Sequence, residues 1–187
     1  MARRVLEAAL IASALLAPAA AQAGWRDQAS TFDQNRLAHI DEARARAMSE
    51  SGGAAAEVLS APVTGGAVTG SWRCRTLKLG GMTDAMVYSW YRCRISAHEG
   101  RLVFEKLSGT QRMAGLLYPE GGGYVYLGAS WVKGEHPHRY SGSGASFGAR
   151  ATPDDQAGML YATASGARIE IPSPIQESDF DVIELRR

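Results

Sequence analysis

From Gly70 to the C-terminus, short runs of β-branched and aromatic residues recur about every ten to fifteen residues, separated by turn sequences. Eight or nine short sequential strands favour an antiparallel up-and-down (calycin-like) barrel or half-barrel, because closure removes the exposed edge strands. The protein is therefore predicted to be mainly β, with about eight strands. The runs lie at 70–79, 86–97, 101–108, 112–119, 123–132, 156–163, 167–172 and 180–186, with a weaker one near 137–148.

Residues 1–23 have the three parts of a bacterial secretory signal in order. Two arginines form the positive n-region, residues 5–18 a mostly apolar h-region, and Ala21-Gln22-Ala23 a small-x-small cleavage site. The alternatives are a buried N-terminal helix or a retained membrane helix, for which the run is short. We expect cleavage near Ala23 and Gly24, a periplasmic or secreted protein, and no integral membrane segment after cleavage.

Residues 24–69 are expected to form an amphipathic helix and a flexible linker, leaving residues 70–187 as the β-barrel domain. Thr31 and Gln34 have capping-box spacing at the start of a helix over 31–48. The other faces of this helix carry charges of both signs, which favours docking on the domain over lying on a membrane. Its apolar stripe comprises Leu37, Ile40, Ala43 and Ala47.

The two cysteines, Cys74 and Cys93, lie in matching contexts in neighbouring strand-like runs. Export would place them in an oxidising compartment, so we predict a structural disulfide. The alternatives are a thiol nucleophile or a metal-binding pair, and the spacing fits neither well. Closing this loop would stabilise the fold by about 3 kcal/mol.

Four arginines flank the cysteines, and strand alternation would place all four on the face opposite the disulfide. In one interpretation the cysteines are buried with Trp72, Tyr91 and Ile95, and the arginines form a solvated stripe. In the other, the arginines point into the barrel mouth and bind a carboxylate or phosphate through their planar forks. The candidate ligand-binding residues are Arg73, Arg75, Arg92 and Arg94, which Lys106, Gln111 and Arg112 could extend.

The acidic tail from Glu177 to Glu184 is predicted to form the closing strand. Its carboxylates would meet some of the flanking arginines across the sheet. Neutralising Asp181 and Glu184 would then destabilise the domain.

Two further motifs have chemical potential. Ser146 lies in a Gly-x-Ser-x-Gly pattern, but a nucleophile elbow needs a strand before it and a helix after it, and turn residues follow here. His136 and His138 could begin a metal site, although no third ligand can be placed. We therefore assign no catalytic residue, metal or cofactor.

Gly70-Ser71-Trp72 resembles the Gly-x-Trp motif that opens the barrel of lipocalins and related calycins, where the tryptophan plugs the barrel floor. A longer resemblance covers most of residues 70–187. There the chain is similar to an uncharacterised family of exported bacterial proteins, a domain of unknown function numbered forty-eight ninety-three. That resemblance implies export and a shared fold but no activity, cofactor or catalytic residue. Its motifs are Cys74-Arg75-Thr76-x-Lys78-Leu79-Gly80, Cys93-Arg94-Ile95, Leu107-Ser108-Gly109-Thr110-Gln111-Arg112, Tyr126-Leu127-Gly128 and the ending from Pro172 to Leu185.

The chain carries 20 lysines and arginines against 19 acidic residues, which argues against nucleic acid or an anionic membrane as the main partner. Our leading hypothesis is a non-enzymatic periplasmic binding or inhibitory module that presents a barrel mouth to a small anionic ligand or an envelope protein. The alternatives are an envelope hydrolase that uses Ser146 or the His136/His138 segment, and a purely structural envelope factor.

Overall fold

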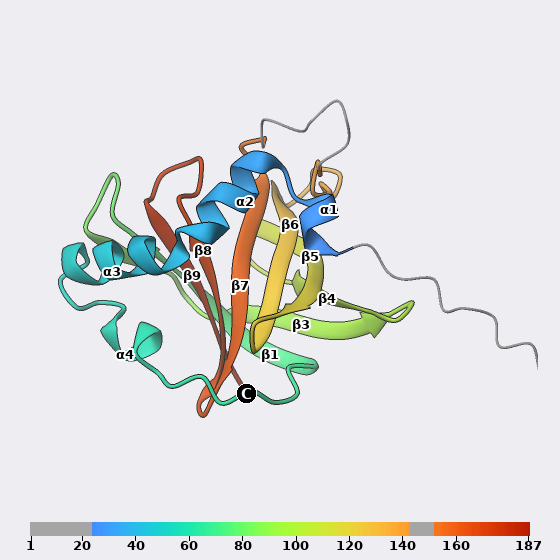
Figure 1. The fold of residues 1–187 in the computed structure, drawn as a ribbon, viewed down its shortest axis with the longest axis horizontal. Helices are drawn as coiled ribbons and strands as arrows, with labels where there is room; N and C mark the ends of the chain where they lie inside the picture. Colours follow the sequence, from blue (N-terminus) through green and yellow to red (C-terminus); the bar gives the residue numbers. More distant parts are fainter. Residues whose placement is uncertain (1–23, 143–151) are drawn as a thin grey trace, which may run out of the picture.

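The computed structural model describes residues 24–142 and 152–187, and its strands form one antiparallel sheet (Figure 1). Eight strands, β1 and β3 to β9, follow one another in chain order, and β1 pairs with β9 to close a barrel. The short strand β2 adds to β1 outside this ring. The predicted mainly β, up-and-down barrel is thus confirmed. The strands are β1 (Gly70–Leu79), β2 (Ala85–Val87), β3 (Tyr91–His98), β4 (Arg101–Lys106), β5 (Gln111–Glu120), β6 (Gly123–Val132), β7 (Asp155–Thr163), β8 (Gly166–Pro172) and β9 (Phe180–Arg186).

Most strand predictions agree with these bounds within two residues, and two differ. The run at 86–97 forms two strands, because β3 pairs with the first half of β1 and β2 with its last three residues. The weaker run near 137–148 has no strand over residues 137–142, and its remainder lies outside the described residues.

Four helices, α1 (Trp25–Gln28), α2 (Thr31–Ala38), α3 (Ile40–Glu50) and α4 (Ala56–Leu59), precede the described barrel strands. The single helix predicted at 31–48 is two helices, because the backbone leaves the helical region at His39 (φ −107°, ψ 21°). The predicted capping box is one residue late: the cap is Ser30, whose hydroxyl accepts from the Asp33 amide at 3.1 Å. None of the described helices is long and apolar enough to cross a membrane.

The helices cover one side of the barrel, where α2 contacts β7 and α3 contacts β8 and β9 (Figure 1). This produces two apolar clusters, one inside the barrel and one between its outer surface and the helices. Leu77 and Leu79 of β1 belong to the outer cluster, whereas Trp72 and Cys74 belong to the interior. The outer cluster also contains the predicted helix stripe, Leu37, Ile40, Ala43 and Ala47.

The barrel interior is filled along most of its length. The Cys74–Cys93 disulfide lies inside with a Cα–Cα distance of 5.8 Å, which confirms the predicted pairing. The Tyr126 ring packs edge-on against Phe104, with ring centroids 5.7 Å apart. Glycine is required at 128, because a Cβ there would lie 2.3 Å from the Tyr126 hydroxyl. Within the described part of the chain, the spaces that adjoin this interior lie towards one end of the barrel.

A buried carboxylate fixes α3 to β8. Glu170 has no exposed surface and accepts from Nε of Arg44 and Nε of Arg168, each at 2.6 Å. Arg168 also donates to the carbonyl of Ala61 at 2.8 Å. This network ties the helices to the barrel wall.

Candidate functional site at the barrel mouth

One end of the barrel is lined by polar side chains, and we call this region the barrel mouth. It lies where β1, β4 and β6 end and β5, β7 and β9 begin. Strand alternation continues the inward faces of the apolar interior to this end, but the side chains there become polar. The barrel mouth is formed by Thr76, Lys78, Lys106, Gln111, Ser130, Gln156 and Asp181.

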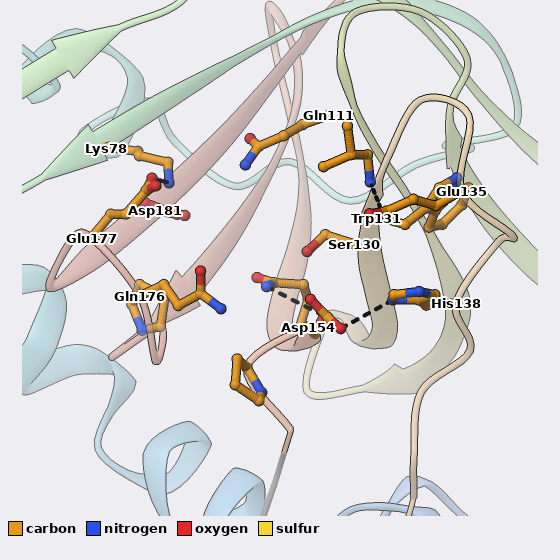
Figure 2. A pocket seen from close by; sticks show the side chains of 14 residues that line it. Lys78, Gln111, Ser130, Trp131, Glu135, His138, Asp154, Gln176, Glu177 and Asp181 are labelled. Carbon is orange, nitrogen blue, oxygen red and sulfur yellow. Dashed lines mark hydrogen bonds and ion pairs between the residues drawn. The ribbon is translucent and has the colours of Figure 1, made fainter.

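The barrel mouth contains two adjacent spaces. An outer chamber of about 260 Å³ opens at the rim, and an inner recess of about 50 Å³ lies adjacent to it. Figure 2 shows Lys78, Glu177 and Asp181 on one side of the outer chamber, with Glu135 and His138 opposite. The two spaces share Lys78, Gln111, Ser130, Gln156 and Asp181.

Lys106 is a buried cation in the wall of the inner recess. Its residue is only 8% exposed, and no described carboxylate forms an ion pair with it. Its ammonium lies 4.7 Å from the centre of the Tyr91 ring. Burial lowers the pKa of Lys106, and repulsion from Arg112 and Lys78 lowers it further. An anion bound in the recess would therefore stabilise the charged form of Lys106.

Asp181 and Lys78 face each other across β9 and β1 and share the barrel mouth. Burial raises the pKa of Asp181 to about 6, although a 2.6 Å hydrogen bond from the Ser178 hydroxyl and the charge of Lys78 both oppose this shift. Burial also opposes the charge of Lys78, but contacts with Glu177 and Asp181 outweigh it and raise the pKa of this lysine. The carboxyl group of Asp181 is therefore expected to titrate near pH 6.

The rim of the outer chamber is acidic. An oxygen of Glu135 accepts from the Val132 amide at 2.7 Å, and Oδ2 of Asp154 lies 3.0 Å from Nδ1 of His138. Ser130 lines the same chamber, yet no serine hydroxyl in the described ranges hydrogen-bonds to His138. Among residues 24–142 and 152–187, the His138–Asp154 pair therefore has no serine nucleophile hydrogen-bonded to it.

The other two motifs of the sequence analysis are not seen in the lining of this chamber among the described residues. His136 does not line it, and Ser146 lies outside the described residues. In residues 24–142 and 152–187, no group of three or more histidine, cysteine or acidic side chains is arranged to hold a metal ion.

The four predicted arginines lie on the outside of the barrel. Their positions alternate with Cys74 and Cys93, which are buried with Trp72 and Ile95, while Tyr91 is only partly buried. Two of them pair with carboxylates: Arg75 with Glu184 at 2.6 Å, and Arg94 with Glu105 at 2.7 Å. Arg73 and Arg75 also contact the Trp90 ring, at 5.3 and 4.8 Å from its centre. Of the predicted ligand-binding residues, Lys106 and Gln111 line the barrel mouth instead, and Arg112 lies beside it on β5, between the inward-facing Gln111 and Met113.

The acidic tail is the closing strand β9, as predicted, but its two buried acids face opposite ways. Glu184 points outward and meets Arg75, whereas Asp181 points inward and faces Lys78. The prediction that Asp181 would meet the arginines was wrong. Asp181 and Glu184 are separated by an odd number of positions on one strand, so their side chains point to opposite faces of the sheet.

Sequence reasoning also missed Lys78, Ser130 and Gln156. Lys78 could have been found, since it follows Trp72, Cys74 and Thr76 in two-residue steps along one strand face.

Comparisons with known proteins leave the activity open. No curated protein and no solved structure matches the chain. One family model matches residues 25–185, and its description is "Domain of unknown function (DUF4893)".

Proposed function

The chain belongs to the DUF4893 family of domains of unknown function, a description that names no activity. From the geometry of the barrel mouth, we propose that the protein is a non-enzymatic binding module for small carboxylate ligands. Lys106 is the observation that carries this proposal. A largely buried cation without an acidic partner weakens a fold, so its presence in a recess favours a functional role. Ser130, Gln111 and Gln156 supply hydrogen-bonding groups around the same space.

The arrangement of His138 and Asp154 favours binding over hydrolysis. A hydrolase needs a nucleophile within reach of its base, and among the described side chains His138 hydrogen-bonds to Asp154 and to no serine. The outer chamber of about 260 Å³ suits a ligand of metabolite size.

Replacing Lys106 with methionine is expected to weaken the binding of a plain carboxylate, hexanoate, at least about tenfold, because a charge-assisted hydrogen bond is lost. Methionine also removes a poorly solvated charge, so the K106M variant should fold. Isothermal titration calorimetry, with ionic strength matched by chloride, measures the affinity.

Lys133→Met provides the matched control, since it makes the same charge change at an exposed lysine that does not line the mouth. Hexanoate that fails to bind the unmodified protein, or that binds K106M equally well, would contradict the proposal.

We also propose that this module is exported and works in the periplasm or outside the cell. The Cys74–Cys93 disulfide supports an oxidising compartment.

Residues 1–23 contain, in this order, a charged region, an apolar region and a cleavage site of small residues. The mature chain is therefore expected to begin at Gly24 or within a residue or two of it. N-terminal sequencing of protein from the periplasmic fraction checks this, and intact Met1 in the membrane fraction is the opposing result.

A further inference from the structure

The charges at the barrel mouth are separated by depth. Lys106 lines the inner recess but not the outer chamber. Glu135, Asp154 and Glu177 line the outer chamber but not the inner recess. The site is therefore cationic inside and acidic at its rim, with Lys78 and Asp181 common to both.

These two sets of charges do not neutralise one another. Glu177 pairs with the shared Lys78, and no described acid pairs with Lys106. Asp154 and Glu135 lie at the rim, where the Asp154 side chain is 46% exposed and remains accessible to a ligand. A ligand that reaches from the recess to the rim would meet a cation at one end and carboxylates at the other.

We propose that the barrel mouth selects amino carboxylates, with the ligand carboxylate at Lys106 and the ligand ammonium at the rim beside Glu135 and Asp154. This inference rests on the proposed binding function and adds the class of ligand. Electrostatic complementarity of this kind determines which ligand and which orientation are accepted. The rim acids do not carry the proposal alone, because Lys106, which is buried and forms no ion pair with a described acid, independently supplies a cation at the inner end.

The test compares two ligands of equal chain length that differ in one amine. Calorimetric titration at matched ionic strength is expected to give at least tenfold tighter binding of 6-aminohexanoate than of hexanoate. The double variant Glu135→Gln, Asp154→Asn should bring the two affinities together by weakening only 6-aminohexanoate. Both residues lie at the rim, so a folded variant is expected, and circular dichroism verifies it.

The matched control is Glu99→Gln, Asp84→Asn, which removes the same two charges from exposed positions outside the barrel mouth. It should leave the preference for 6-aminohexanoate unchanged. Equal affinity of the unmodified protein for both ligands, or a preference that survives the rim variant, would overturn this inference while leaving carboxylate binding intact. Failure of both ligands to bind would instead overturn the proposed function itself.

Discussion

Replacing Glu170 with glutamine is expected to lower the free energy of unfolding by about 3 kcal/mol or more, because the change leaves two guanidinium groups without their shared carboxylate. Glu170 is fully buried, and its partners Arg44 and Arg168 have side chains that are 21% and 6% exposed. The expected loss lies towards the lower end of the range for buried pairs, since Arg44 retains some contact with water. Urea unfolding at neutral pH, followed by circular dichroism, measures the change.

Two further variants separate charge from packing in this network. Glu57→Gln is the surface control: Glu57 is 87% exposed and reaches Arg186 only at 3.4 Å, so no measurable change is expected. Arg168→Met combined with Glu170→Leu replaces buried charge with apolar groups and should recover much of the lost stability. A Glu170→Gln variant as stable as the unmodified protein would show that the network does not hold α3.

Replacing Asp181 with asparagine is expected to stabilise the domain above pH 6 by about 3 kcal/mol, since burial raises its pKa from 3.8 to about 6. An acid with a raised pKa binds its proton more tightly in the folded state than in the unfolded chain. Its ionisation therefore opposes folding, a cost that grows between about pH 4 and pH 6 and is complete above that range. The same cost is absent below pH 4, where both states are protonated.

The free energy of unfolding, measured in urea at pH values from 4 to 8, tests this sign. The difference between the Asp181→Asn variant and the unmodified protein should be small at pH 4 and largest above pH 6. The exposed Asp84→Asn serves as the control. A variant that is less stable than the unmodified protein at pH 8 would contradict the raised pKa of Asp181.

These expected effects distinguish charges that stabilise the fold from charges that the fold tolerates. Glu170 and Glu184 are buried with guanidinium partners and contribute to stability. Asp181 and Lys106 are buried at the barrel mouth, and burial disfavours the charged form of each. Groups whose charges oppose folding are expected where function requires them, which is consistent with a binding site at this end of the barrel.

Features that depend on local alternation could be predicted from the sequence. The two-residue period of β1 and β3 is sufficient to place Cys74 and Cys93 on one face and the flanking arginines on the other. The short strands and intervening turns likewise predict an antiparallel meander, which the pairing of neighbouring strands confirms. These inferences need only the geometry of an extended backbone.

Only the tertiary structure decided which face of each strand is the inside. Along β1 the apolar positions change phase, from Trp72 and Cys74 on one face to Leu77 and Leu79 on the other. The phase changes because the helices cover the outer wall there and bury the second pair, so the polar Thr76 and Lys78 face inward at the mouth. Apolar residues in a strand indicate which of its faces are buried. In a barrel with an apolar cluster on both sides of its wall, this pattern cannot distinguish the interior from the covered exterior.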